Sequence, residues 1–277
     1  MHTLVEKRQL STHTLETWEW VSPALGCAKR ASVLVPRTCT SAGAEVPVLF
    51  LLHGFGGSRT TWLTGTRLAE HLAELDLLVV LPESGRRWFI NDDRGCRYED
   101  YLLDELVPFV DARYAVHVRP GTRGIGGFSM GGAAALMQAL RHPDVFRVAV
   151  SHAGAFEAPS RVGDPYADQR RNRDMAIPST EAHERVWGPP GSPVRRRYDL
   201  SALLDAGHFP GCLSVYADVG SHDYPRIIEM NRRTVRKLTD SGIDTEFFER
   251  PGGHDLEFLD RALPFSLKFA ERRLKRS

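Results

Sequence analysis

The stretch that decides the fold of this 277-residue chain is Gly124-Ile125-Gly126-Gly127-Phe128-Ser129-Met130-Gly131-Gly132-Ala133. Its first five residues are typical of a short buried strand, and the Ala-rich pattern that follows is typical of a helix. Between them, the pattern G-x-S-x-G predicts a sharp strand-to-helix turn that exposes a serine. The stretch therefore identifies Ser129 as a candidate nucleophile on a strained turn.

Two phosphate-binding motifs that also contain glycines do not fit the same stretch. A dinucleotide fingerprint beginning at Gly124 and Gly126 requires Gly or Ala at position 129, which is a serine here. A P-loop requires Lys after Gly131, where the chain has Gly132. The pattern thus favours a serine nucleophile over a nucleotide site.

Apolar runs and helical patterns alternate on both sides of this stretch. Runs typical of buried strands lie at 47–52, 77–81, 124–128, 146–150, 212–219 and 245–249. Helical patterns lie at 62–75, 98–114, 131–141, 226–238 and 256–274. The alternation predicts a single α/β domain, 1–277, with a mostly parallel sheet covered by helices on both faces. Alternating residues from Leu15 to Pro36 add an antiparallel edge pair.

Residues 155–211 show no clear period and hold many prolines. We interpret them as a short, irregular, cap-like insertion over the sheet, because long excursions in compact domains are usually functional. Arginines and carboxylates nearly balance within it, so most of them are expected to be surface pairs. Its rings Tyr166 and Trp187 are candidates for substrate contacts.

A glycine-rich loop, His53-Gly54-Phe55-Gly56-Gly57, follows the strand that ends at Leu52. In acyl transfer the tetrahedral intermediate needs two backbone N–H donors. We expect Phe55 and the residue after the nucleophile, Met130, to supply them as an oxyanion hole. His53 is expected to form structural hydrogen bonds.

The acid and the base are expected in two later loops. For a nucleophile on this kind of turn, the acid and then the histidine follow the serine in chain order. Asp223 follows one predicted strand and His254 follows the next, so both belong at the carboxyl edge of the sheet. His254 would accept the Ser129 proton on one ring nitrogen while Asp223 holds the other. The competing acid, Asp218, lies inside a strand, which favours a role in fixing the turn.

Other residues near this edge are candidates for contacts with a substrate. Trp88 and Phe89 follow the strand 77–81, and at least one of them is expected to line a pocket. His152, at the end of another predicted strand, is a further candidate.

Taken together, these motifs resemble the putative-esterase family of α/β-hydrolases, which includes esterase D (S-formylglutathione hydrolase), feruloyl and siderophore esterases and mycolyltransferases. The resemblance runs from about Val21 to Ala270 and includes Gly220-Ser221-His222-Asp223 and Pro251-Gly252-Gly253-His254-Asp255. It implies an α/β-hydrolase fold, the triad of Ser129, Asp223 and His254, and a small-molecule carboxylic ester as substrate, without a cofactor.

Three alternatives to a carboxylesterase remain. Esterase D-like enzymes carry a Gly-Leu-Thr-Cys oxyanion loop, whereas this chain has Gly54-Phe55-Gly56-Gly57, so a thioesterase of that type is second choice. An acyltransferase would use the same triad, because an alcohol or amine can discharge an acyl-enzyme as water does. A non-catalytic binding module is disfavoured by the intact set of residues.

Composition narrows the classes of partner. The net charge of +1 gives no field that favours nucleic acid or an acidic membrane. No apolar run of 18 residues exists, and charges follow the first methionine closely, so we expect a cytoplasmic protein without membrane contact. The four cysteines lack metal-site spacing, so no metal is expected. Nothing in the sequence specifies an oligomeric state.

Overall fold

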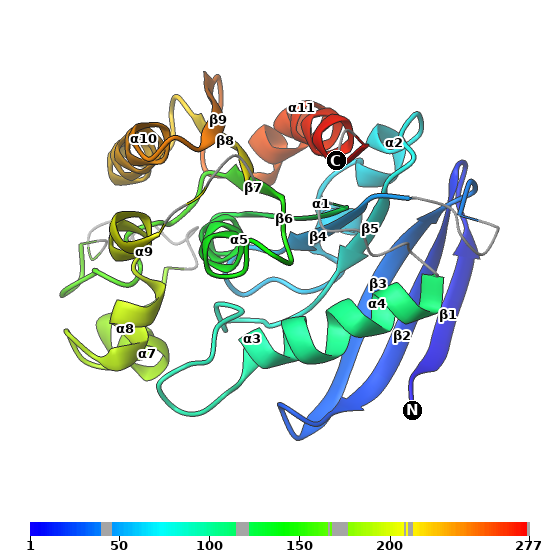
Figure 1. The fold of residues 1–277 in the computed structure, drawn as a ribbon, viewed down its shortest axis with the longest axis horizontal. Helices are drawn as coiled ribbons and strands as arrows, with labels where there is room; N and C mark the ends of the chain where they lie inside the picture. Colours follow the sequence, from blue (N-terminus) through cyan, green and yellow to red (C-terminus); the bar gives the residue numbers. More distant parts are fainter. Residues whose placement is uncertain are drawn as a thin grey trace.

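One mixed sheet organises the molecule in the computed structural model, which describes residues 1–39, 46–114, 122–165, 167, 177–207, 209 and 213–275 (Figure 1). The strand order is β1-β2-β3-β5-β4-β6-β7-β8-β9. Strands β4 to β9 pair in parallel, and β1, β2 and β3 form an antiparallel extension that joins through β5. The strands are β1 (Thr3–Gln9), β2 (His13–Ser22), β3 (Cys27–Pro36), β4 (Val48–Leu52), β5 (Leu78–Leu81), β6 (Arg123–Phe128), β7 (Val148–His152), β8 (Ser214–Gly220) and β9 (Asp244–Arg250).

Helices cover both faces of this sheet, as the sequence predicts. Helix α11 packs with α1 and α2 on one face, whereas α5 packs against β6 and β7 on the other (Figure 1). The first helices are α1 (Thr61–Gly65), α2 (Leu68–His71), α3 (Tyr98–Asp100), a π-helical stretch η1 (Tyr101–Leu106) and α4 (Val107–Tyr114). The later ones are α5 (Met130–Arg141), α7 (Thr180–Trp187), α8 (Pro193–Tyr198), α9 (Leu200–Ala206), α10 (Pro225–Asp240) and α11 (Leu256–Lys275).

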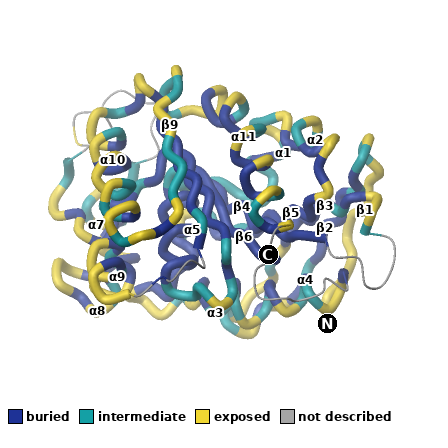
Figure 2. Tube along the Cα trace, turned by 45° about the horizontal axis from the view of Figure 1, so that its top comes forward, coloured by how far each residue is buried: buried dark blue, intermediate teal, exposed yellow. Residues whose placement is uncertain are grey.

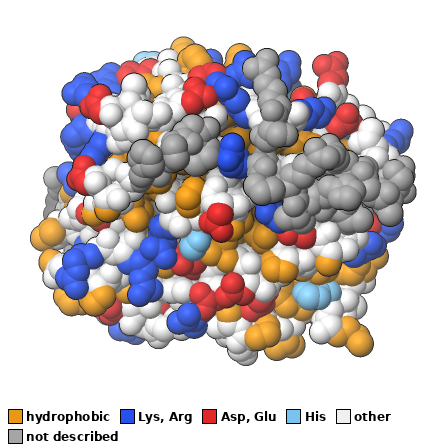
Figure 3. All heavy atoms as spheres, viewed as in Figure 1, with side chains coloured by type: hydrophobic (Ala, Val, Ile, Leu, Met, Phe, Trp, Pro, Cys, Tyr) orange, Lys and Arg blue, Asp and Glu red, His pale blue; other side chains and the backbone are white. Residues whose placement is uncertain are grey.

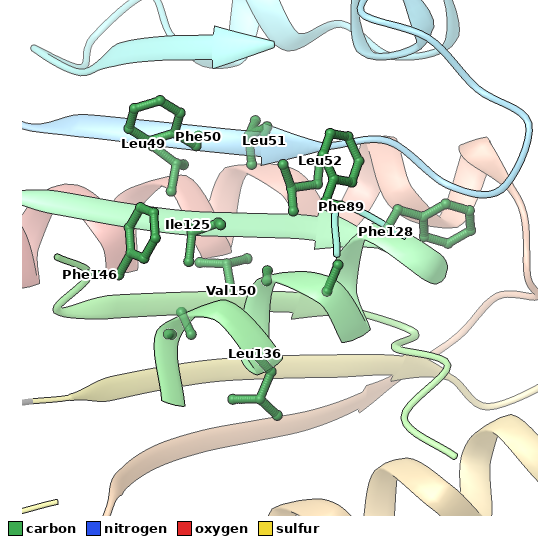
Figure 4. Packing of buried hydrophobic residues seen from close by; sticks show 14 of the residues in the cluster. Leu49, Phe50, Leu51, Leu52, Phe89, Ile125, Phe128, Leu136, Phe146 and Val150 are labelled. Carbon is green, nitrogen blue, oxygen red and sulfur yellow. The ribbon is translucent and has the colours of Figure 1, made fainter. Parts of the chain in front are cut away.

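The core lies where the central parallel strands meet these helices. All five residues of β4 and all six of β6 are buried, because a parallel strand covered on both faces has no solvent side (Figure 2). On the face seen in Figure 3, acidic and basic side chains are interspersed, in keeping with the near-zero net charge. Figure 4 shows side chains from β4, β6 and β7 packing with Leu136 of α5. This packing fixes the carboxyl edge of the sheet, where the loops of interest begin.

Two predicted elements differ from the structure. A third strand, β1, extends the predicted edge pair. All seven of its residues are exposed, so its sequence lacks the alternation of apolar and polar residues that marks a half-buried strand. The helical pattern at 62–75 is split into α1 and α2, and Asp260 accepts a hydrogen bond of 2.7 Å from the Arg67 backbone where α2 begins. A tertiary contact, absent from any local pattern, thus interrupts the predicted helix.

The insertion 155–211 is more regular than its sequence suggests, since its described parts contain α7, α8 and α9. Each of these short helices begins at a side-chain cap, from Ser179, Ser192 and Asp199 respectively. The buried Arg195 guanidinium donates to the carbonyl oxygens of Pro159 and Arg161. Arg195 therefore ties α8 to the start of the insertion.

In the described part of the chain, no helix has both the length and the apolar character needed to cross a membrane.

Candidate active site

Ser129 occupies the strand-to-helix turn that its motif predicts. It lies between β6 and α5 with φ 56° and ψ −112°, a left-handed conformation that is strained for a residue with a side chain. A Cβ atom on Gly131 would overlap the Leu52 carbonyl oxygen, and one on Gly127 would overlap the Gly131 backbone. The Ser129 N–H donates to the His152 carbonyl oxygen at 2.8 Å, so the neighbouring strand holds the turn in place.

Three side chains predicted from separate loops form one chain of hydrogen bonds. His254 Nε2 lies 2.8 Å from Ser129 Oγ, and His254 Nδ1 lies 2.8 Å from Asp223 Oδ2. The Asp223 side chain is fully buried, and its other oxygen accepts a hydrogen bond of 2.6 Å from the Tyr224 backbone. An ionised carboxylate only accepts, so Nδ1 carries the proton and the Nε2 lone pair faces the Ser129 hydroxyl. This tautomer suits a general base.

Two residues beside Ser129, Phe55 and Met130, have backbone N–H groups that could bind an oxyanion. Within the described residues, neither Phe55 nor Met130 donates its backbone N–H to another protein group. The adjacent Gly56 N–H bonds to the Gly85 carbonyl oxygen at 2.9 Å, which pins the loop while leaving the Phe55 N–H available. Met130 is the first residue of α5, whose N-terminal end carries partial positive charge. The pair has the chemistry that a developing oxyanion needs.

His53 fixes the loop that carries Phe55. Its Nε2 accepts from the Ser84 N–H at 2.9 Å, so its Nδ1 carries the proton and donates to the Gly54 carbonyl oxygen at 2.7 Å. Burial lowers the pKa of His53 to about 4, which keeps the ring neutral near pH 7. These contacts match the structural role expected of His53.

A pocket of about 260 Å³ opens above Ser129, and most of its walls are apolar. Trp88 is one of these walls, as the sequence suggests for at least one residue of its loop. The lining residues are Gly54, Phe55, Gly57, Thr61, Trp88, Phe128, Ser129, Met130, Ala155, Glu157, Ala158, Arg161, Ile177, Pro178, His183, Arg226, Ile227, Met230, His254 and Leu256.

Three candidates for substrate contact lie elsewhere, and their assignment is corrected. Phe89 is fully buried in the core beside His53, with a ring-centroid distance of 5.3 Å (Figure 4). Trp187 is also fully buried and packs behind Trp88, at 5.3 Å between centroids. His152 is fully buried below the turn, where its ring bonds to other core side chains. The remaining candidate, Tyr166, lies outside the described residues.

The sequence reasoning missed the contribution of α10 to the pocket. Arg226, Ile227 and Met230 line it from the first turns of this helix. The available signal was that α10 begins at Pro225, two residues after Asp223, so its first turns must lie near the site. Glu157, Arg161 and His183, from the insertion, were likewise not singled out.

No metal centre accompanies these groups in the described parts of the chain, where no set of three or more His, Cys, Asp or Glu side chains is grouped to bind an ion.

Comparisons with known proteins identify the family of the chain. Residues 22–269 match the family described as Putative esterase. An acetyl esterase of Caldicellulosiruptor saccharolyticus is 27% identical over 217 residues, covering 76% of this chain and 78% of that protein. An esterase of Mycobacterium tuberculosis is 25% identical over 265 residues, covering 86% of this chain but 55% of that longer protein.

Solved structures resemble the whole fold. The fluorophosphonate-binding serine hydrolase F of Staphylococcus aureus superposes with a TM-score of 0.79 at 22% identity, covering 94% of this chain and 99% of that one. An S-formylglutathione hydrolase of the same organism gives 0.75, also at 22% identity and with the same coverage. These similarities confirm the α/β-hydrolase fold that the sequence predicts.

Proposed function

The chain belongs to the Putative esterase family and is a serine hydrolase that acts on esters, and we propose that it is a carboxylesterase that hydrolyses a small-molecule ester through an acyl-enzyme on Ser129. The observation that carries the proposal is the hydrogen-bonded chain from Ser129 Oγ through His254 to Asp223, beside an apolar pocket. Its geometry suits a base-activated serine.

In the first half of the reaction, Ser129 Oγ attacks the carbonyl carbon of the ester while His254 Nε2 takes the hydroxyl proton. Asp223 stabilises the imidazolium that forms. The N–H groups of Phe55 and Met130 donate to the oxyanion. When the intermediate collapses, the carbonyl C–O bond to the alcohol breaks and His254 returns the proton to the leaving oxygen.

In the second half, water takes the place of the alcohol. His254 removes one of its protons, the hydroxide attacks the acyl carbon, and Ser129 leaves with the proton from His254. The acid product and the free enzyme result. No cofactor takes part in either half, because proton transfer and oxyanion binding supply the chemistry.

The size and lining of the pocket support a small ester. Its volume of about 260 Å³ is below the usual 300–1,000 Å³ range for drug-sized ligands. Apolar walls from Trp88, Ile227 and Met230 suit an acyl chain.

We also propose that residues 155–211 form a cap within a single domain and restrict which esters enter. Support comes from the seven lining residues this segment contributes, which are Ala155, Glu157, Ala158, Arg161, Ile177, Pro178 and His183.

Hydrolysis of p-nitrophenyl esters from acetate to octanoate tests the proposal, together with a fluorophosphonate label located by mass spectrometry. We expect turnover, equal amounts of acid and alcohol, and label on the Ser129 peptide. Folded protein that hydrolyses no ester of the panel and takes up no label would refute the proposal. Formation of a new ester after addition of a primary alcohol would instead identify an acyltransferase.

A further inference from the structure

The apolar lining of the pocket is interrupted by three charged side chains, Glu157, Arg161 and Arg226. Arg161 is almost fully buried, and its Nη2 donates to the Pro178 carbonyl oxygen at 2.8 Å and lies 3.4 Å from Asp164. Its charge is therefore offset inside the insertion. Glu157 and Arg226 come from different segments, and both line the pocket.

Two arginines of α10 share the single carboxylate of Glu157. Arg226 Nη2 lies 2.8 Å from Glu157 Oε2, and Arg233 contacts the other oxygen, Oε1. The two arginines are seven residues apart, two helical turns, so they project from the same face of α10. Two positive charges against one negative charge leave an excess of +1 beside the pocket.

Neighbouring carboxylates do not remove this excess. Glu229, on the same helix, pairs with Arg232, and the Asp223 side chain is fully buried behind His254. Each of Arg226 and Arg233 has an ion pair only with Glu157 in the described part of the chain. A guanidinium has five N–H donors, so both retain donors for a second anion.

The same surface continues away from Ser129. A second cleft shares Glu157 and Met230 with the pocket and is also lined by Asp199, Arg233 and Lys237. Lys237 pairs with Asp205, and the Asp199 carboxylate caps α9. Figure 3 shows Lys and Arg side chains, with acidic side chains among them, over the region of α10 at the upper left of that view. A group that leaves the apolar pocket in this direction therefore meets Arg233, which shares Glu157 with Arg226.

We propose that Arg226 and Arg233 bind a carboxylate on the alcohol part of the substrate, so that the preferred ester is an anion. This inference rests on the proposed esterase function. The acyl chain contacts the apolar walls of the pocket, and the alcohol part extends past Arg226 into the adjoining cleft lined by Arg233. Glu157 pairs with both guanidinium groups before substrate arrives, so it competes with the substrate for their charge.

The test compares 4-acetoxybenzoate with its uncharged methyl ester, and the readout is the ratio of the two kcat/KM values. We expect Arg226→Gln and Arg233→Gln each to lower this ratio about fivefold, the effect of roughly 1 kcal/mol for an exposed ion pair. Glu157→Gln should raise the ratio, because it frees both arginines. Arg226→Lys should keep most of it, and added salt should lower it in the unmodified protein.

Arg232→Gln is the matched control, since Arg232 lies on the same helix but pairs with Glu229 and Glu249. This variant should leave the ratio unchanged. The inference is overturned if the ratio does not fall in Arg226→Gln and Arg233→Gln, or if it falls in Glu157→Gln. Hydrolysis of the methyl ester by these variants would still support the proposed esterase function. Failure of the unmodified protein to hydrolyse either ester would count against the proposed function itself.

Discussion

Asp218 Oδ1 lies 2.7 Å from His152 Nδ1, and neither side chain is exposed to solvent. The other ring nitrogen of His152 lies 2.9 Å from Ser266 Oγ, so the contact links β7 to β8 and to α11. Backbone bonds run beside it, from the Ala153 N–H to the Asp218 carbonyl oxygen and from the Ser129 N–H to that of His152. The pair supports the nucleophile turn from below without reaching the pocket.

The two aspartates should therefore have opposite phenotypes when changed to asparagine. Asp223→Asn should lower kcat for p-nitrophenyl acetate by about 10⁴-fold with little change in stability, since His254 loses the partner that fixes its tautomer. Asp218→Asn should instead lower the free energy of unfolding by about 1–3 kcal/mol, the cost of a weakened buried hydrogen bond. Steady-state kinetics and urea unfolding measure both effects. Exchange of the two phenotypes would show that the acid is misassigned.

The nucleophile has its own test. Ser129→Ala should lower the hydrolysis of p-nitrophenyl acetate by roughly 10⁴-fold or more, because no other hydroxyl contacts His254 Nε2 in the described residues. The circular dichroism spectrum should not change, as the variant removes one oxygen atom from a partly exposed position. Retention of more than a tenth of the rate would exclude Ser129 as the nucleophile.

Residues with a local signature were the easiest to predict. Only glycine fits at positions 127 and 131, because a Cβ atom there would overlap neighbouring backbone atoms. The motif around Ser129 therefore contains a glycine at each of these positions. The chain order of strands then points to the loops of Asp223 and His254. The fold class follows from the same alternation of strands and helices, and it is confirmed.

The residues that line the pocket were predicted poorly, because their positions depend on how helices and strands pack together. An aromatic ring at 187 or a histidine at 152 has the same sequence context whether it faces a pocket or the core. Arg226 and Met230 were missed because the face of α10 that meets the pocket is set by packing against β8, β9 and α9. Local sequence patterns therefore point to candidate reacting groups more directly than to the residues that line the pocket.

Trp88 and Trp187 should differ in their effect on acyl-chain preference. Trp88 lines the pocket, so Trp88→Ala enlarges it and should raise kcat/KM for hexanoate relative to acetate. Trp187 lies behind it, at 5.3 Å between ring centroids, so Trp187→Phe should change this preference less and mainly reduce stability. Rates across p-nitrophenyl esters and thermal unfolding distinguish the two. An equal shift in preference for both variants would place Trp187 in contact with substrate.

Acid should destabilise the fold through two buried histidines. Burial lowers the pKa of His53 to about 4, and burial together with the charges of Arg161 and Arg195 lowers that of His183 to about 3. The unfolded chain titrates near 6.5, so between pH 6.5 and 4 it binds protons that the folded protein excludes. Stability is therefore fully present above pH 6.5 and falls as the pH drops towards 4.

A carboxylate adds to this loss at lower pH. Burial alone would raise the pKa of Glu99, but the nearby His142 and the hydrogen bonds and charge of Arg141 outweigh it and lower the pKa to about 2. Its contribution is thus present above pH 4.5 and is lost as the pH falls through 2. His53, His183 and Glu99 all lower the stability of the fold as the pH falls, and the two histidines do so at a higher pH than Glu99.

The histidine contribution is measurable as a slope of stability against pH. Each excluded proton contributes about 1.4 kcal/mol per pH unit, so His53 and His183 together should contribute up to about 2.8 kcal/mol per unit to the fall near pH 5. His183→Gln should reduce that slope by about 1.4 kcal/mol per pH unit, because glutamine does not titrate. This change in slope is independent of any loss of stability that the variant shows at pH 7. The exposed His222→Gln provides the control for loss of a histidine, and urea unfolding at pH 7, 6 and 5 gives the slopes. An unchanged slope in His183→Gln would mean that His183 is protonated in the folded protein, which contradicts its burial beside Arg161 and Arg195.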